Sequence, residues 1–251
     1  MPKIITVHSF RRGTGKSIIS ANLAAMLAMA GQRVGVLDAD VLSPSLHWLL
    51  GLGQTKIDGT LTDFLLDQRS IEQTAHDVTS RLSAGAKGRL FLIPASDDAL
   101  RIAQLLRDRY ESDRLGEGCQ HLIDQLALDV LVVDTHAGLN QDSLAAMAMS
   151  DVLLIVLRLD QQDYQGTAVT IDVARRLGIP ALSLIVNQAP ESFQPPTIIA
   201  QLEQTYHCPV AGLLPLSQDL MVQSESSLFV LNHARHPITT ALAHIAAQFG
   251  A

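Results

Sequence analysis

The 251-residue sequence has few cysteines, few aromatic residues and no long apolar stretch. Its two cysteines, Cys119 and Cys208, allow at most one disulfide, and neither belongs to a CxxC or CxxH pair. This usage indicates a reducing compartment and argues against a zinc or redox motif. Aromatic residues make up 4% of the chain, too few for a surface that stacks nucleic-acid bases. No stretch approaches the roughly 20 apolar residues of a membrane span.

Charged residues are also sparse, at 17% of the chain, with 25 acidic side chains against 18 basic ones. The net charge of -7 argues against a dedicated nucleic-acid-binding protein, although a local basic face stays open. The N-terminal sequence MPKIITVHS lacks the charged and apolar regions of a secretory signal. Residues 239–251 contain no Lys or Arg, so they lack the basic face that holds an amphipathic helix on anionic lipid. We therefore expect a cytoplasmic protein with neither a membrane span nor a C-terminal membrane-targeting helix.

Short apolar runs alternate with helical patterns along the whole chain. The runs expected to form strands are 4–8, 34–37, 90–93, 130–133, 152–157, 182–186 and 210–214. The expected helices are 17–30, 98–110, 118–126, 141–149, 161–177, 196–206 and 239–249. No linker rich in Pro, Gly or Ser interrupts them, so the pattern predicts one α/β domain over residues 1–251, a doubly wound and mostly parallel sheet with helices on both faces. Residues 51–88 are the least regular, and we interpret them as a long surface connection with a short helix near 61–66.

The most informative motif is Gly13-Thr14-Gly15-Lys16-Ser17, which follows the first expected strand and opens the first expected helix. In such a turn, consecutive backbone N–H groups and the positive end of the helix dipole face a phosphate. The lysine reaches the β and γ phosphate oxygens, and the serine hydroxyl can bind Mg²⁺. The alternative is a glycine-rich turn that carries a solvent-exposed lysine. The strand–turn–helix context favours a phosphate-binding loop.

This loop is not a regular Walker A motif, because Phe10 occupies the place of the first glycine. It resembles the deviant Walker A of the MinD/ParA/Mrp family of P-loop ATPases, in which a KGG segment usually precedes xGK[ST]; here that segment reads Arg11-Arg12-Gly13. Further resemblances lie at 37–46 (switch I), 132–139 (Walker B and switch II), 185–187 (the strand end that contacts adenine), 214–219 (the loop beside the base) and 236–237 (the start of the final helix). The resemblance covers nearly the whole chain and implies a P-loop NTPase fold of the SIMIBI type.

The resemblance also implies a role for each position. Lys16, Asp40 and Arg11 are the implied catalytic residues: Asp40 orients the attacking water, and Arg11 stands where the family's lysine reaches the phosphates of a partner subunit. The implied Mg²⁺ site consists of Ser17, Asp38 and Asp134. The implied ATP-binding residues are Arg12, Gly13, Thr14, Gly15, Lys16, Ser17, Ile18, Asn187, Pro215 and Leu216.

Three interpretations stay open at the level of the residues. Asp38 either serves the metal or caps the following turn. Arg11 keeps the charge of the family's lysine with a different geometry, whereas Arg12 replaces a glycine, so it either obstructs the loop or takes over the contact in trans. The segment 158–167 is either an interface or a helix start with Asp160 as its N-cap.

The resemblance implies an ATP-hydrolysing switch that forms an ATP-dependent homodimer, responds to a cognate activator protein and positions or partitions a cargo. A plasmid, a chromosome region and a protein organelle such as a carboxysome are the cargoes considered. ParA-like relatives bind DNA without sequence preference as ATP dimers, which leaves DNA binding and nucleoid association open here. The alternative is a nucleotide-dependent scaffold with negligible hydrolysis, because Arg11-Arg12 stand in the signature lysine segment. Retention of Asp40 favours hydrolysis.

Overall fold

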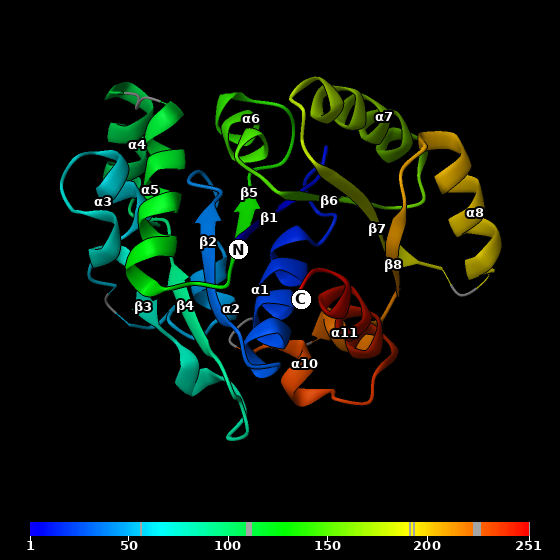
Figure 1. Ribbon diagram of the computed structural model, residues 1–251, viewed down its shortest axis with the longest axis horizontal. Helices are drawn as coiled ribbons and strands as arrows, with labels where there is room; N and C mark the ends of the chain where they lie inside the picture. Colours follow the sequence, from blue (N-terminus) through cyan, green and yellow to red (C-terminus); the bar gives the residue numbers. More distant parts are fainter. Residues whose placement is uncertain (56, 109–111, 191, 193, 223–226, 251) are drawn as a thin grey trace.

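The computed structural model describes residues 1–55, 57–108, 112–190, 192, 194–222 and 227–250. Its centre is an eight-stranded sheet with the order β3-β4-β2-β5-β1-β6-β7-β8 (Figure 1). The strands are β1 (Lys3–His8), β2 (Arg33–Ala39), β3 (His76–Asp77), β4 (Arg89–Ile93), β5 (Val130–Thr135), β6 (Val152–Leu157), β7 (Ala181–Ala189) and β8 (Val210–Pro215). The short edge strand β3 pairs antiparallel with β4, and the other pairings are parallel. The prediction of a mostly parallel α/β sheet is confirmed.

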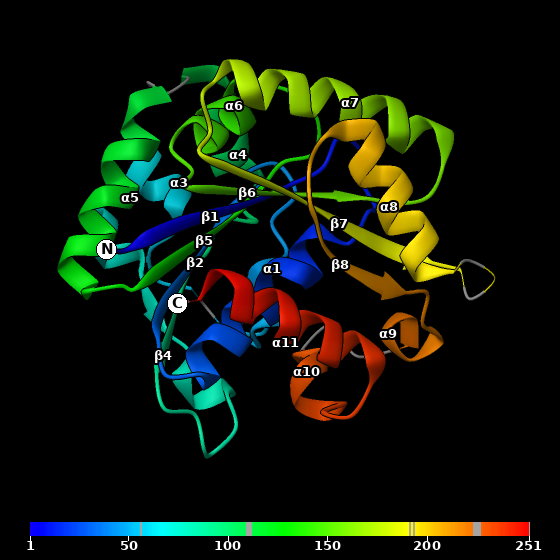
Figure 2. The same cartoon turned by 45° about the vertical axis from the view of Figure 1, so that its right-hand side comes forward.

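Helices cover both faces of the sheet (Figure 2). They are α1 (Lys16–Met29), α2 (Leu46–Leu49), α3 (Leu61–Leu65), α4 (Ala99–Asp108), α5 (Ser112–Leu126), α6 (Gln141–Ala148), α7 (Gln161–Arg176), α8 (Pro195–Tyr206), α9 (Gln218–Val222), α10 (Phe229–Asn232) and α11 (Pro237–Phe249). One face carries α1, α10 and α11, and the other carries α4 to α8. None of the helices in the described part of the chain has the length and apolar character needed to cross a bilayer.

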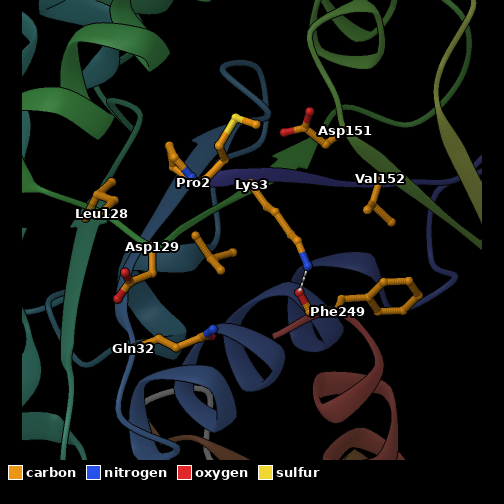
Figure 3. Close-up of a pocket in the computed structure, with 10 residues that line it drawn as sticks. Pro2, Lys3, Gln32, Leu128, Asp129, Asp151, Val152 and Phe249 are labelled. Carbon is orange, nitrogen blue, oxygen red and sulfur yellow. Dashed lines mark hydrogen bonds between the residues drawn. The ribbon is translucent and has the colours of Figure 1, made fainter. Parts of the chain in front are cut away.

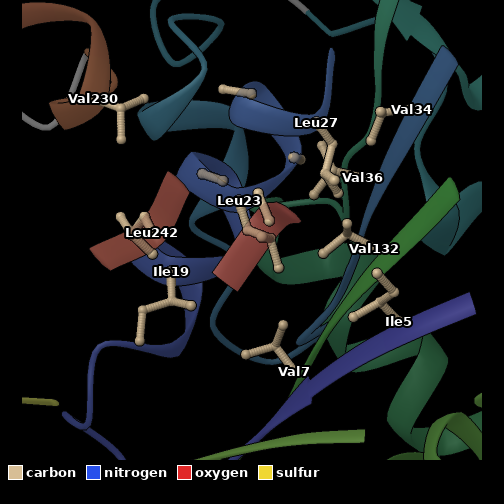
Figure 4. Close-up of a cluster of buried hydrophobic side chains, with 14 of the residues drawn as sticks. Ile5, Val7, Ile19, Leu23, Leu27, Val34, Val36, Val132, Val230 and Leu242 are labelled. Atoms are coloured by element: carbon tan, nitrogen blue, oxygen red, sulfur yellow. The ribbon is translucent and has the colours of Figure 1, made fainter. Parts of the chain in front are cut away.

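The core lies in two layers because successive strand residues point to opposite faces. On β5, Val130 and Val132 pack against the layer built by α1 and α11 (Figure 4), whereas Leu131 and Val133 pack in the layer beneath α5 and α6. Both sets are buried, which explains why this strand is a continuous apolar run in the sequence. The Ala-rich helix α1 packs against both the sheet and α11, which itself also contacts β8, and buries ten of its residues.

The expectation for residues 51–88 is partly wrong. The short helix is present as α3, which begins with a capping box between Thr60 and Asp63. The segment is more than a surface connection, however, because Leu61, Ile71 and Val78 are each at most 3% exposed. Two other differences concern helices: α5 begins at Ser112, six residues before the expected start, and α9 and α10 lie where no helix was expected. The expected end of α4 at residues 109 and 110 lies outside the described residues.

Candidate nucleotide site

The polar residues singled out in the sequence meet at one edge of the sheet. Parallel pairing places Asp38 of β2 directly beside Asp134 of β5, and Val7 of β1 beside Asp134 on the other side. The loop of residues 9–15, which leads from β1 into α1, therefore lies over the ends of these central strands. Ligands of open α/β sheets bind at this edge, outside the carboxyl ends of the strands.

The phosphate-binding loop depends on its two glycines. Gly13 and Gly15 have φ of 79° and 90°, values that glycine adopts without strain. A Cβ on Gly15 would lie 2.3 Å from Nδ2 of Asn187, which donates a hydrogen bond to the carbonyl oxygen of Thr14 at 2.7 Å. In this structure Asn187, which is predicted to contact adenine, therefore supports the phosphate-binding loop. Gln188 adds a second contact, from Nε2 to the carbonyl oxygen of Gly13 at 3.4 Å.

Arg12 fits the loop without backbone strain. Among the described residues, the non-glycine positions with positive φ are Asp67, Ala127, Gln188 and His207, so Arg12 does not need the angle of the glycine it replaces. Its guanidinium turns toward the switch segments, with Nη1 donating to Oγ of Ser43 at 3.3 Å and Nη2 lying 3.1 Å from Nε2 of His136. The side chain is held against these two residues.

Arg11 points the other way, to the start of α7. Its Nη1 lies 3.1 Å from Asp160 and its Nε 3.3 Å from Asp163, and it also contacts Gln162. Asp160 accepts hydrogen bonds from the backbone N–H groups of Gln162 and Asp163, so the predicted N-cap is confirmed. A contact of Arg11 with a second subunit would require these ion pairs to open. The pair with Asp160 is partly exposed, so it contributes only about 1 kcal/mol or less, whereas Asp163 is buried at 2% exposure.

A second contact joins the phosphate-binding loop to α7. The ring of Phe10 lies against Gly166 of α7, where a Cβ would come within 2.1 Å of the ring. Arg158 completes the charged cluster, with Nη2 at 3.3 Å from Asp160 and Nε at 3.3 Å from Asp163. The segment 158–167 therefore holds the first part of the phosphate-binding loop.

Asp38 and Asp134 are fully buried side by side at the centre of the site. Burial raises the pKa of both carboxyl groups, and the neighbouring carboxylates raise it further. Lys16 and the hydroxyls of Ser17 and Ser20 act in the opposite direction on the pKa of Asp134. Two carboxylates in this setting favour a cation between or beside them.

The two carboxylates use their oxygens differently. Asp38 accepts hydrogen bonds from the backbone N–H groups of Ser45 and Leu46 at 2.9 and 3.0 Å, so it caps the start of α2, the alternative noted for it. Asp134 accepts from Oγ of Ser20 at 2.9 Å through Oδ1, while its buried Oδ2 has no partner among the described residues. An unpartnered buried carboxylate oxygen fits a hydrated Mg²⁺. No group of three or more His, Cys, Asp or Glu side chains in the described ranges could hold a metal alone, so nucleotide phosphates and water would complete the ligands.

Asp40 stands at the rim of the site, with 12% of its side chain exposed. Its Oδ1 accepts a hydrogen bond from the backbone N–H of Ser43 at 3.0 Å and lies 2.7 Å from Nδ1 of His136. The second contact was not predicted, because it joins residues 96 positions apart. The remaining histidine of the site, His8, is buried under the loop with Nδ1 at 2.8 Å from Oγ1 of Thr135. Burial, together with the charge of Lys16, lowers the pKa of His8 to about 3.

The residues predicted beside the base also reach this edge. Pro215 pairs with Ala189 at the ends of β8 and β7, and the backbone N–H of Leu216 donates to the carbonyl oxygen of Ala189 at 2.9 Å. Leu216 is 50% exposed, and Ile18 lies half-buried in the first turn of α1. The fold therefore brings all the predicted site residues to the edge formed by the carboxyl ends of the strands. Their individual roles stay predictions.

A hollow lies at the opposite, amino end of the strands (Figure 3). It has a volume of about 870 Å³ and is lined in part by Lys3, Gln32, Asp129 and Asp151. Asp129 and Asp151 each accept a hydrogen bond at 2.8 Å, from the backbone N–H groups of Arg33 and Ile4. The carboxylates of this hollow therefore hold the ends of strands together.

Comparison with known proteins agrees with the geometry. A family model described as ParA, NUBPL iron-transfer P-loop NTPase, matches residues 1–76. The septum site-determining protein MinD of Synechocystis is 30% identical over 233 residues, which cover 89% of this chain and 80% of that protein. The chain belongs to the ParA/MinD family of P-loop NTPases.

Two further matches span almost the whole of this ParA/MinD-family chain. An ATP-binding protein of Methanocaldococcus jannaschii is 28% identical over 247 residues, covering 97% of this chain and 86% of that protein. The crystallised septum site-determining protein MinD of Pyrococcus horikoshii, complexed with Mg-ADP, superimposes with a TM-score of 0.82 at 20% identity. That match covers 99% of this chain and 96% of the other, and it shows that the fold is shared.

Proposed function

We propose that this chain is an ATP-binding and ATP-hydrolysing switch that dimerises around its nucleotide and positions or partitions a cytoplasmic cargo, and that residues 1–251 act as one P-loop domain. The observation that carries this proposal is the buried pair Asp38–Asp134 beside Lys16, Ser17 and the glycine loop. An ordinary core does not place two adjacent carboxylates at full burial, one with an unpartnered oxygen. Membership in the ParA/MinD family and the likeness to a MinD that holds Mg-ADP support the same interpretation.

The position of each site residue is compatible with a specific role in ATP hydrolysis. The backbone N–H groups of residues 13–17 and the first turn of α1 would bind phosphate, and Lys16 would neutralise its charge. Ser17, Asp38 and Asp134 would hold a Mg²⁺ ion with its water molecules, and that ion would offset negative charge on the phosphates. Asp40 would orient the attacking water at the rim. Positioning and charge neutralisation are most of what phosphoryl transfer asks of a protein.

The proposal extends to partners. We infer a homodimer that forms with ATP, in which Arg11 or Arg12 reaches the partner subunit's phosphates, and an activator protein that stimulates hydrolysis. Arg11 would first have to leave Asp160 and Asp163, so nucleotide binding and release of this cluster would be linked. Non-specific DNA is a second candidate ligand of the dimer. A plasmid, a chromosome region and a protein organelle stay open as cargo.

An iron–sulphur carrier function, suggested by the description of the matching family model, has less support. Cys119 lies in α5 at 0% exposure and Cys208 precedes β8 at 3% exposure. The two thiols belong to separate hydrophobic clusters, and burial raises the pKa of each. Thiols in these positions are poor ligands for a cluster shared between two subunits.

The experiment that tests the proposal measures the sedimentation of the purified chain and its release of phosphate from Mg-ATP, alone and with DNA or the activator. The wild type is expected to sediment as a dimer with ATP and as a monomer with ADP, and to release phosphate. Asp40→Ala should still bind ATP and form the dimer, because Asp40 makes no direct hydrogen bond to the described residues of the phosphate-binding loop, but should lose turnover.

Two outcomes would contradict the proposal. Equal, near-zero phosphate release by the wild type and Asp40→Ala under every condition would favour the nucleotide-dependent scaffold. A monomer in all nucleotide states would remove the dimerising switch. If Arg11→Ala and Arg12→Ala both leave ATP-dependent dimerisation and turnover unchanged, the contact in trans is wrong.

A further inference from the structure

A histidine links the phosphate-binding loop to the carboxylate at the rim of the site. His136 follows β5, and its two ring nitrogens face different partners: Nδ1 lies 2.7 Å from Oδ1 of Asp40, and Nε2 lies 3.1 Å from Nη2 of Arg12. The side chains of His136 and Asp40 are only 14% and 12% exposed, so water competes weakly for the contact between them. The side chains of Arg12, His136 and Asp40 thus come from segments distant in sequence and form one hydrogen-bonded row.

The hydrogen-bond partner of one ring nitrogen of His136 determines whether the other ring nitrogen donates or accepts. A guanidinium has only N–H donors, so Nε2 of His136 must accept the hydrogen bond from Arg12. Neutral imidazole carries its single proton on the other nitrogen, which makes Nδ1 the donor to Oδ1 of Asp40. The row therefore has one direction: Arg12 donates to His136, and His136 donates to Asp40.

This arrangement restrains the carboxylate of Asp40. Its Oδ1 receives hydrogen bonds from both His136 and the backbone N–H of Ser43, the latter at 3.0 Å. Two donors on one oxygen fix the rotation of the carboxyl plane. No donor from the described part of the chain reaches Oδ2 of Asp40. This oxygen is therefore the one left to accept a hydrogen bond from a water molecule.

We propose that His136 is a positioning residue for Asp40 and that Arg12 selects the tautomer of His136 in which it can act. The inference rests on the proposed ATP hydrolysis and adds two residues to it. It gives Arg12 a task within its own subunit, held by contacts to His136 and Ser43, whereas Arg11 is held at α7.

The test compares steady-state ATP turnover of the wild type with His136→Ala, His136→Asn and His136→Gln. The amide nitrogen of Asn takes the place of Nδ1 and can still donate to Asp40, whereas that of Gln takes the place of Nε2. His136→Ala and His136→Gln should lower kcat by roughly 10- to 100-fold with KM for ATP changed by less than about twofold. His136→Asn should recover most of the loss. His244→Ala, an exposed position on α11, serves as the matched control and should leave both constants unchanged.

A double variant and a spectrum separate positioning from a merely structural role. Asp40→Ala with His136→Ala should be no slower than Asp40→Ala alone, because His136 acts through Asp40. A long-range ¹H–¹⁵N correlation spectrum should show His136 as the Nδ1–H tautomer in the wild type and as a mixture of tautomers in Arg12→Ala.

The outcomes distinguish this inference from the proposed function. Wild-type turnover together with an unchanged kcat in His136→Ala overturns the positioning role and leaves the ATPase intact. Equal losses in His136→Asn and His136→Ala, or a further loss in the double variant, also overturn it. No Asp40-dependent turnover by the wild type overturns the ATPase and the positioning role with it, and the spectrum then reports on the hydrogen-bonded row alone.

Discussion

The two ends of one sheet differ in how their polar groups are satisfied. At the carboxyl end, buried polar atoms of the site have no partner among the described residues, namely Nε2 of His8, Oγ1 of Thr14 and Oδ2 of Asp134. At the amino end, the carboxylates Asp129 and Asp151 each accept a backbone hydrogen bond at 2.8 Å. A hollow of about 870 Å³ nevertheless lies at the amino end.

This difference indicates that the site is marked by buried polar atoms without a partner, among them a carboxylate oxygen of Asp134, rather than by the presence of a hollow. The amino end has one comparable atom, Oε1 of Gln32, but it belongs to a neutral amide whose nitrogen contacts the carbonyl oxygen of Gly250. A neutral amide costs far less to bury than a carboxylate.

The largest effect is expected from the lysines. Lys16→Ala removes the positive charge that lies buried beside Asp134, so ATP turnover should fall by roughly 1,000-fold. Lys3→Ala, at the amino end, removes a contact to the carbonyl oxygen of Phe249 at 3.3 Å and should leave turnover unchanged. Phosphate release at saturating Mg-ATP checks both. A strong loss in Lys3→Ala would break the distinction between the two ends.

The next effect concerns the glycines. Gly15→Ala forces a side chain to φ of 90° and against Nδ2 of Asn187, so the free energy of unfolding should fall by about 2 kcal/mol. Gly85→Ala, in an exposed turn where a Cβ meets nothing within 4 Å, should change it by less than about 0.5 kcal/mol. Urea denaturation measures both values. Equal values for the two variants would mean that the loop is not held by Asn187.

The next effect is a change in the free energy of unfolding with pH, which we expect from His8. Its pKa in the folded protein is about 3 and its ordinary value is 6.5, so the unfolded chain takes up a proton first as the pH falls. The contribution of His8 to stability is therefore constant above pH 6.5 and decreases as the pH falls from 6.5 to 3, by up to about 1.4 kcal/mol per pH unit.

His8→Asn tests this expectation because the amide can still contact Thr135 but does not titrate. The slope of the unfolding free energy against pH should become shallower than in the wild type, whereas His244→Asn on the exposed side of α11 should keep the wild-type slope. Parallel slopes for all three proteins would show that His8 is not held neutral.

The smallest effect is expected at the amino end. Asp129→Ala removes one acceptor of the backbone N–H of Arg33, which should cost about 1 kcal/mol of stability. ATP turnover should equal that of the wild type, because no residue of the proposed site touches Asp129. Urea denaturation and phosphate release check the two halves of this prediction. A slower turnover with unchanged stability would place function at this end as well.

Much of the fold could be predicted because buried parallel strands are continuous apolar runs. Residues 152–157 were expected as a strand and form β6 with the same bounds. The sequence predicts that this helix begins at Gly118, whereas α5 begins at Ser112. In the structure this glycine lies inside α5, where a Cβ would come within 2.7 Å of the Phe64 ring, so close packing of α3 on α5 requires it. Such a requirement is visible only once the helices are packed.

The site was predicted as a set of residues but not as a set of contacts. The loop motif, Asp38 of β2 and Asp40 just after β2 follow from local spacing, and the fold places them together. The row from Arg12 through His136 to Asp40 depends on the pairing of Asp38 with Asp134, which brings the loops after β2 and β5 side by side. The attachment of Arg11 to Asp160 likewise joins residues 149 positions apart. Local sequence carries no information on these contacts.

The most direct test of the account is hydrogen–deuterium exchange of the protein with and without Mg-ADP. Binding at the carboxyl end predicts slower exchange at 10–18, 134–140, 187–189 and 215–217, and unchanged exchange at 1–3, 128–130 and 150–152. Protection confined to the amino-end segments, or no protection at 10–18 at saturating nucleotide, would contradict the claim that the unpartnered polar atoms at the carboxyl end form the nucleotide site.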